Sequence, residues 1–278
     1  MFPNTWNVGL DIQSNSLRAI AAQQRRGGWQ LRHWWQQNLP YAVLRDGYLD
    51  QSESLIPLLR QWRIRLPRHI SLRIALPVQR VLQHVIPAPD ARLQEPARDR
   101  YITAQGAKQF PLDSQTLALD YRPPQERAAQ LLLTAARQQE LQMWLRCLQQ
   151  ADLSPQVVDI TPCALLAMGE AAGLPADAVL LHRLDDHWLW AAPRSAAFAC
   201  GVLRESETDG ADRALAAVLA ANAGAETLYY SSVLDEPAPE GARLWSPLDA
   251  FPYRQAPLPA KPGAFVLAGG LALRQEDC

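Results

Sequence analysis

The first apolar run of the chain, "WNVGLDI", ends in an aspartate, and a hydroxyl- and amide-rich turn, "QSNS", follows it. A carboxylate such as Asp11 can order water around a magnesium ion, and Ser14, Asn15 and Ser16 can hydrogen-bond phosphate oxygens. These residue types at this spacing are one way to hold a metal–phosphate ligand. The same side chains also suit an ordinary hairpin, in which they bond neighbouring backbone groups. The residues alone leave both interpretations open.

Other catalytic and metal-binding patterns are missing from the sequence. It contains no GxxxxGK[ST], GxSxG or HExxH motif, which argues against an ordinary hydrolase. His182, Asp185, Asp186 and His187 do not have a common zinc spacing, and a polar group of this kind is typical of a hairpin tip. No cysteines are spaced as CxxC, which favours buried, reduced thiols.

Arginine carries nearly all of the positive charge, since the only lysines among 27 basic residues are Lys108 and Lys261. The formal net charge of −1 gives no overall attraction to DNA or to anionic lipid. One run, "RQWRIRLPRHISLR" at 60–73, concentrates arginines. It suits a solvated helix end and loop, or a contact with lipid headgroups or nucleic acid. Lipid fits better than DNA because the whole chain has no basic excess.

Asp11 and its turn belong to a first predicted unit, residues 1–77. Residues 6–39 read as a three-stranded meander with hairpin turns. A helix is predicted over 52–64, where apolar side chains recur on one face, and a strand over 70–77. The predicted order is β-β-β-α-β.

A second unit, residues 78–160, reads as an inserted β/α subdomain. The predicted strands are 80–87, 116–123, 129–136 and 155–160, and the predicted helices are 90–110 and 137–153. A connecting helix follows within 161–176, with Pro162 near its start and Gly173 at its end.

The third unit, residues 177–278, repeats the first. The predicted strands are 178–184, 187–193, 196–203 and 227–233, with a helix over 210–225. A proline-rich segment, 235–262, is predicted to be a loop packed on the surface or a mobile segment. The sequence therefore predicts an α/β protein with two similar halves that face a cleft. No apolar run approaches the ~20 residues that span a bilayer, and no secretory leader is evident, so we expect a cytosolic protein.

A doubled β-β-β-α-β unit around a cleft is the layout of the actin-like ATPase fold, and several stretches narrow the resemblance. They occur in this order: "VGLDI" with its serine-containing turn, "AKQFPLDSQTLALDY", "LLLTAARQQELQMWLRCLQQADLSPQVVDITPCALL" and "GLALR". Over nearly the whole chain, the sequence resembles the type IV pilus assembly protein PilM family, and most of all its enterobacterial HofM branch.

This resemblance implies a cytoplasmic actin-like scaffold, peripheral to the inner membrane, in a type IV pilus or DNA-uptake assembly complex. Its expected partner is the short cytoplasmic N-terminal peptide of a bitopic PilN- or HofN-like protein, which would also supply the membrane association. No direct contact with nucleic acid is expected. Two alternatives are a nucleotide-switched ATPase of the same complex and a GspL-like cytoplasmic domain of a type II secretion system.

The resemblance also defines a nucleotide cleft and shows where this chain departs from the pattern. The family's first turn reads roughly D-I-G-S-S-S-x-K, but Gln13 replaces the glycine and Arg18 stands at the lysine position. Actin-like ATPases place Asp-x-Gly after the first strand of the second half, where this chain has residues 182–184. We therefore predict no enzyme activity and no required cofactor, with weak binding of ATP and magnesium as the residual option.

The residues of that cleft would be Asp11, Ser14, Asn15, Ser16, Arg18, Gly269 and Gly270. The two glycines would approach an adenosine, or else serve a tight strand–helix junction.

The partner groove is predicted between the first unit and the insertion. It would use the following residues: Lys108, Phe110, Leu112, Leu117, Leu119 and Tyr121. The peptide would add a strand or fill an apolar pocket. The alternative for Phe110 and Leu112 is that both belong to the core.

Overall fold

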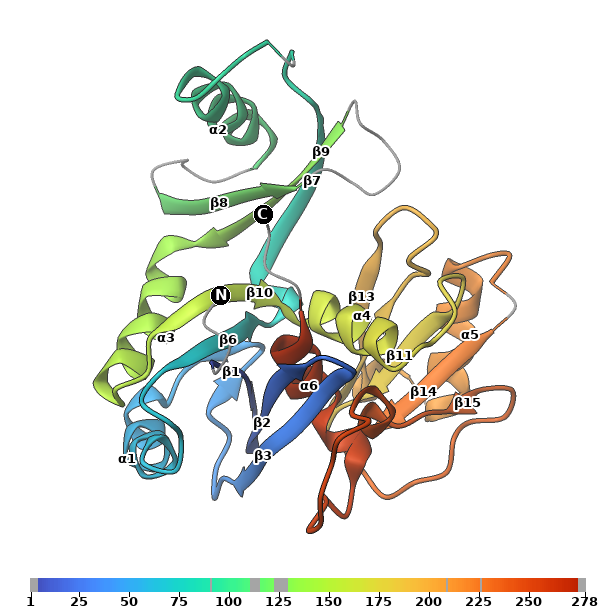
Figure 1. The fold of residues 1–278 in the computed structure, drawn as a ribbon. Coiled ribbons are helices and arrows are strands. Elements are labelled where there is room, and N and C mark those ends of the chain that lie inside the picture. The colour runs from blue at the N-terminus through green and yellow to red at the C-terminus, as the bar shows by residue number, and fades with distance from the viewer. Residues whose placement is uncertain are drawn as a thin grey trace.

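The structure, a computed structural model, describes residues 5–90, 92–110, 116–122, 130–208, 210–225 and 227–274. Leu112, one of the predicted partner-binding residues, lies outside them. Two five-stranded sheets lie side by side, and a smaller three-stranded sheet stands above the first of them (Figure 1). No helix in the described ranges is long and apolar enough to cross a membrane.

The first sheet has the strand order β10-β6-β1-β2-β3. Its strands and the helices on it are β1 (Trp6–Gln13), β2 (Ser16–Arg25), β3 (Gly28–Asn38), β6 (Ile70–Leu76), β10 (Pro155–Ile160), α1 (Ser52–Arg63) and α3 (Gln138–Gln150). Its core lies between the sheet and these two helices, and includes stacked Trp35 and Trp62 with ring centroids 5.0 Å apart. The meander predicted over 6–39 is present, because alternating side chains pair two hairpins in register.

The three-stranded sheet has the order β7-β9-β8 and carries one helix. Its elements are β7 (Val81–Pro87), α2 (Ala97–Gln109), β8 (Leu117–Arg122) and β9 (Gln130–Arg137). A small apolar core, which includes Ile102 and Leu133, joins the helix to the sheet.

The inserted subdomain contains fewer residues than the predicted range of 78–160. β10 pairs in parallel with β6, and Trp144 and Leu148 of α3 lie in the first unit's core. Residues 138–160 therefore belong to the first half, and the insertion proper is β7 to β9. The end of the insertion could not be predicted from local sequence patterns, because it depends on the pairing of β10 with β6, which lie about eighty residues apart in the chain.

The second five-stranded sheet has the order β13-β12-β11-β14-β15. Its elements are β11 (Val179–Arg183), β12 (His187–Ala191), β13 (Cys200–Arg204), α5 (Ala211–Ala221), β14 (Leu228–Ser232) and β15 (Arg243–Leu244). The first two hairpins and the parallel β11–β14 pair repeat the β1–β2–β3 and β1–β6 pairings of the first sheet. The predicted duplication is confirmed.

Two buried helices, α4 (Thr161–Ala171) and α6 (Val266–Leu273), join the halves (Figure 1). Residues 235–262 are only partly a surface loop, because Leu248, Ala250 and Phe251 are buried in the core beside α4 and α6. Elsewhere in the segment, the Pro257 carbonyl accepts a hydrogen bond of 2.8 Å from Trp34 Nε1. Short elements complete the chain: β4 (Leu44–Arg45), β5 (Tyr48–Leu49) and the 3-10 turns at Val78–Arg80, Glu205–Glu207, Pro247–Ala250 and Pro262–Phe265.

Candidate functional site

The β1–β2 hairpin places Asp11 directly opposite Arg18. Both side chains are buried, with 4% of each exposed, and Gln13 donates a hydrogen bond of 2.6 Å from Nε2 to Asp11 Oδ1. Burial raises the pKa of Asp11 to about 6, against the lowering effect of the Arg18 charge and of the Gln13 bond. Burial also lowers the pKa of Arg18, against the effect of Asp11. The carboxylate is therefore costly to ionise in spite of its counter-ion.

The β11–β12 hairpin faces this pair from the second half. His182 is buried, its Nδ1 lies 2.9 Å from Ser231 Oγ, and burial together with the charge of Arg18 lowers its pKa to about 3. His182 is therefore a neutral imidazole at pH 7. Asp185 acts electrostatically on both Asp11 and Arg18, so the two hairpin tips approach one another.

Other polar side chains of the second hairpin interact with neighbouring residues of the same half. Arg183 stands 4.0 Å over the Trp188 ring and pairs with Glu205 at 2.8 Å. His187 Nδ1 lies 2.6 Å from Asp186 Oδ1.

These side chains fit a magnesium–triphosphate poorly. The carboxylate that would order magnesium-bound water already accepts from Gln13 and faces a buried guanidinium. Arg18, at the family's lysine position, provides a fixed positive charge inside the hairpin. Ser16 Oγ and the Nε and Nη1 of Arg18 have no hydrogen-bond partner among the described residues. What the hairpin offers is thus one buried cation and one hydroxyl, and no glycine-lined cradle.

Gly269 and Gly270 do not line this cleft. Both lie inside the buried helix α6. A Cβ at Gly270 would lie 1.8 Å from the carbonyl oxygen of Ala164 on α4, and one at Gly269 would lie 2.5 Å from Met168 Sδ. The glycines let two helices touch backbone to backbone, so neither the adenosine contact nor the strand–helix junction is correct. The all-apolar run "VLAGGLAL" was the signal for a buried helix.

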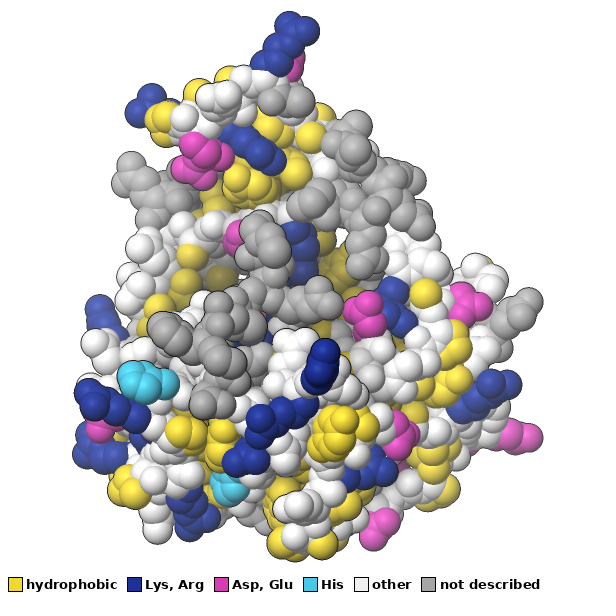
Figure 2. Space-filling model, viewed as in Figure 1, with side chains coloured by type: hydrophobic (Ala, Val, Ile, Leu, Met, Phe, Trp, Pro, Cys, Tyr) yellow, Lys and Arg dark blue, Asp and Glu magenta, His cyan; other side chains and the backbone are white. Residues whose placement is uncertain are grey.

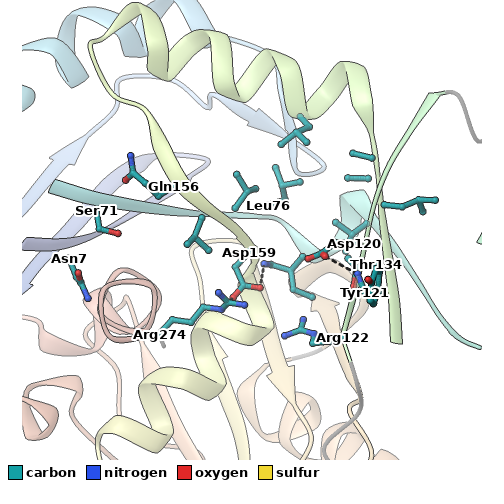
Figure 3. Close-up of a pocket in the computed structure, with 18 of the residues that line it drawn as sticks. Asn7, Ser71, Leu76, Asp120, Tyr121, Arg122, Thr134, Gln156, Asp159 and Arg274 are labelled. Carbon is teal, nitrogen blue, oxygen red and sulfur yellow. Dashed lines mark hydrogen bonds and ion pairs between the residues drawn. The ribbon is translucent and has the colours of Figure 1, made fainter. Parts of the chain in front are cut away.

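A groove of about 1260 Å³ lies between the first half and the insertion (Figure 3). Its walls include β8 and β10, each of which is the end strand of its sheet within the described part of the chain. Apolar side chains line it alongside polar ones; the larger aliphatic ones are Ile70, Leu76, Val81, Leu119, Leu141, Val157, Val158 and Ile160.

Two of the predicted partner-binding residues, Leu119 and Tyr121, line this groove. Phe110 and Leu117 are buried in the core between α2 and its sheet, so they cannot offer apolar surface to a peptide. Lys108 is exposed and is not among the lining residues. The core alternative is thus the correct one for Phe110.

The polar groups of the groove come from positions far apart in sequence. Asp159 at the end of β10 pairs with Arg274, and Gln156 Oε1 accepts from the Leu72 backbone at 2.5 Å. Arg98 stands 5.7 Å over the Tyr121 ring. Asn7 and Ser71 add buried polar side chains, and Ser71 Oγ has no partner among the described residues (Figure 3).

Sequence reasoning missed these polar residues. The one available signal was Asp159, an aspartate at the end of the strand "PQVVDI", just as Asp11 ends "WNVGLDI".

Two sheets with the same strand pairings, joined by α4 and α6 and facing each other through their first hairpins, define the actin-like ATPase fold. The family model of the type IV pilus assembly protein PilM matches residues 9–179. The chain belongs to this family.

One curated protein and two solved structures are similar to this chain over most of its length, and the two structures share its fold. The DNA utilization protein HofM of Escherichia coli (strain K12) is 28% identical over 271 residues, which is 96% of each chain. The structure of the PilM–PilN type IV pilus biogenesis complex contains a chain that matches with a TM-score of 0.74 and 17% identity, over 98% of each chain. The cytoplasmic domain of EpsL, from the type II secretion system of Vibrio cholerae, matches with a TM-score of 0.58 and 11% identity, over 97% of this chain and 95% of that one.

Proposed function

We propose that this protein is a scaffold of an inner-membrane pilus or DNA-uptake assembly complex, and that it binds the cytoplasmic N-terminal peptide of a PilN- or HofN-like partner. The observation that carries the proposal is the groove between β8 and β10. Family membership supports the assembly role, and the matching chain comes from a complex with PilN.

The two strand edges give the groove a way to bind an extended chain. β8 pairs only with β9, and β10 pairs only with β6, within the described part of the chain. Among the described residues, no strand pairs with the other edge of either one, and the backbone N–H and C=O groups there can pair with a peptide in β-augmentation. Leu119, Tyr121, Val157 and Val158 supply apolar contacts beside those edges.

The chemistry of the hairpin cleft supports a scaffold over an ATPase. A hydrolase needs a metal-bound nucleotide and a positioned water. Here Gln13 donates to the carboxylate of Asp11, Arg18 lies opposite it on β2, and His182 stands where the second acidic turn would be. ATP hydrolysis is therefore not part of the proposed function.

Hydrogen exchange tests the binding mode. The synthetic N-terminal peptide of the PilN-like protein from the same organism is added, and exchange of backbone amides is compared with and without it. Slower exchange in β8 or β10, with the β11–β14 pair unchanged, is the expected result. Unchanged exchange in both edge strands under saturating peptide would contradict the proposal.

A further inference from the structure

The first half of the chain is far more basic than the whole. Residues 12–45 hold five arginines and residues 54–89 hold six, and neither stretch contains an aspartate or a glutamate. Residues 177–274, in contrast, hold twelve acidic and eight basic residues. The net charge of −1 is therefore the sum of a positively charged first half and a negatively charged second half. Figure 2 shows dark blue side chains gathered over the lower left, above α1 and the first sheet, with magenta more frequent over the second half.

Part of this arginine content is structural. Arg60 donates to the Gln150 carbonyl at 2.5 Å, and Arg63 donates to the Asp152 and Pro67 carbonyls at 3.1 and 2.9 Å. Arg73 is buried and donates to the backbone of α6. These three hold the ends of helices and strands together, so they are not part of a docking surface.

Five of the other arginines gather at one edge of the first sheet, together with a histidine. We call this edge the basic edge, and it consists of Arg25, Arg26, Arg32, Arg65, Arg68 and His69. All six side chains are exposed, and none of the five arginines forms an ion pair with a carboxylate of the described residues. Exposed arginines without a carboxylate partner favour an anionic ligand over a structural role.

Side-chain and backbone contacts join the parts of this edge. Arg32 stands 5.1 Å over the Trp6 ring, and Trp6 is in register with Ile70, which directly follows His69. Arg25 Nε donates to Gln30 Oε1 on the neighbouring strand at 2.9 Å. The charge of Arg65 contributes, after burial, to the lowered pKa of His33 beside Arg32.

An apolar side chain projects from the same edge. Ile64, between Arg63 and Arg65, is 82% exposed, the most exposed large apolar side chain of the described residues. An exposed isoleucine among arginines suits the boundary of a bilayer, where headgroup phosphates meet the arginines and acyl chains meet the isoleucine. A nucleic-acid backbone offers the phosphates without an apolar layer.

From this arrangement we infer that the basic edge, with Ile64, is a contact surface for an anionic phospholipid bilayer. The edge also adjoins the groove, since Ile70 lines the groove and is in register with Trp6. A peptide that leaves the groove at this end toward a membrane would bring the basic edge to the same membrane. The inference goes beyond the proposed function and does not depend on peptide binding.

The test is sedimentation of the purified full chain with phosphatidylcholine vesicles, with and without phosphatidylglycerol, at low and physiological salt. We expect binding only to the anionic vesicles and weaker binding at the higher salt. Each basic residue near such a surface contributes about fivefold, so Arg65→Gln/Arg68→Gln should lower the partition coefficient roughly tenfold or more. The matched control is Arg213→Gln/Arg243→Gln, two exposed arginines of the second half, which should leave partition unchanged.

A second variant and a second ligand distinguish binding to a bilayer from binding to any polyanion. Ile64→Ser should lower vesicle binding severalfold without any change in charge. A duplex DNA of random sequence is titrated at the same salt. Equal partition of Arg65→Gln/Arg68→Gln and the unchanged protein would overturn the inference. So would DNA binding that is tighter than vesicle binding and unaffected by Ile64→Ser, because that result would assign the edge to nucleic acid.

Discussion

Asp11 and Arg18 stand opposite each other across the β1–β2 hairpin, and both side chains are buried. The hairpin thus contains a buried carboxyl group and a buried guanidinium at the place where a nucleotide-binding hairpin would face phosphate groups. This pair is one reason why the cleft retains the actin-like layout while its residues fit a triphosphate poorly.

The pair should be energetically coupled. Removing Arg18 as Arg18→Gln takes away the cation opposite the buried Asp11, and the carboxyl can then take up a proton because its pKa is already about 6, so the loss in unfolding free energy should be about 1–2 kcal/mol at pH 7. The double variant Asp11→Asn/Arg18→Gln should lose less than the two single losses added together. Urea unfolding of the four proteins at pH 7 measures the coupling. Additive losses would mean that the two side chains act independently.

Asp11 should also make stability depend on pH. Its pKa is raised from 3.8 to about 6 in the folded state, so the folded protein holds this proton more tightly than the unfolded chain does. This contribution to stability is therefore present at low pH and is lost as the pH rises from about 4 through 6. Relative to the unchanged protein, Asp11→Asn should gain about 1–3 kcal/mol between pH 4 and pH 7. The measurement is the unfolding free energy of both proteins at pH 4 and at pH 7. An equal difference between the two proteins at both pH values would contradict the raised pKa.

No magnesium-dependent ATP hydrolysis is expected. The first turn lacks the glycine, and residues 182–184 do not supply the second acidic turn. Phosphate release from purified protein should equal that from Asp11→Asn, which serves as the matched control. A steady turnover that disappears in Asp11→Asn would restore the ATPase alternative.

The helix pair α4–α6 should not tolerate a methyl group at its contact. Gly270→Ala would place a Cβ 1.8 Å from a backbone oxygen, so the helices must separate, at a cost of several kcal/mol, which outweighs the gain of about 1 kcal/mol in helix propensity. The comparison is Gly173→Ala, which has a φ of +76° but open space around it and should cost only about 1 kcal/mol. A stable Gly270→Ala protein would contradict the packing of α6.

The sequence predicted what depends on local pattern. Alternation between residues 6 and 39 indicates a meander, and its repetition after 177 indicates the doubled fold. Pairings between distant segments were not predictable in this way: β10 lies beside β6, and α6 lies against α4. Phe110 illustrates the same limit, because an apolar residue after a helix has the same pattern whether it faces a core or a groove. The polar lining of the groove, from Asn7 to Arg274, comes together only in the folded chain.

A binding titration with groove variants tests the central claim most directly. A fluorescent N-terminal peptide of the PilN-like partner is titrated with the unchanged protein, with Tyr121→Ala and with Val85→Ala. Tyr121 lines the groove, whereas Val85 is 46% exposed on the same small sheet and is not among the lining residues. Loss of one aromatic contact in an interface should weaken binding about tenfold or more. We predict that loss for Tyr121→Ala, with Val85→Ala unchanged and both variants folded by circular dichroism. Equal affinity of all three proteins for the peptide would contradict the groove between β8 and β10 as the partner site.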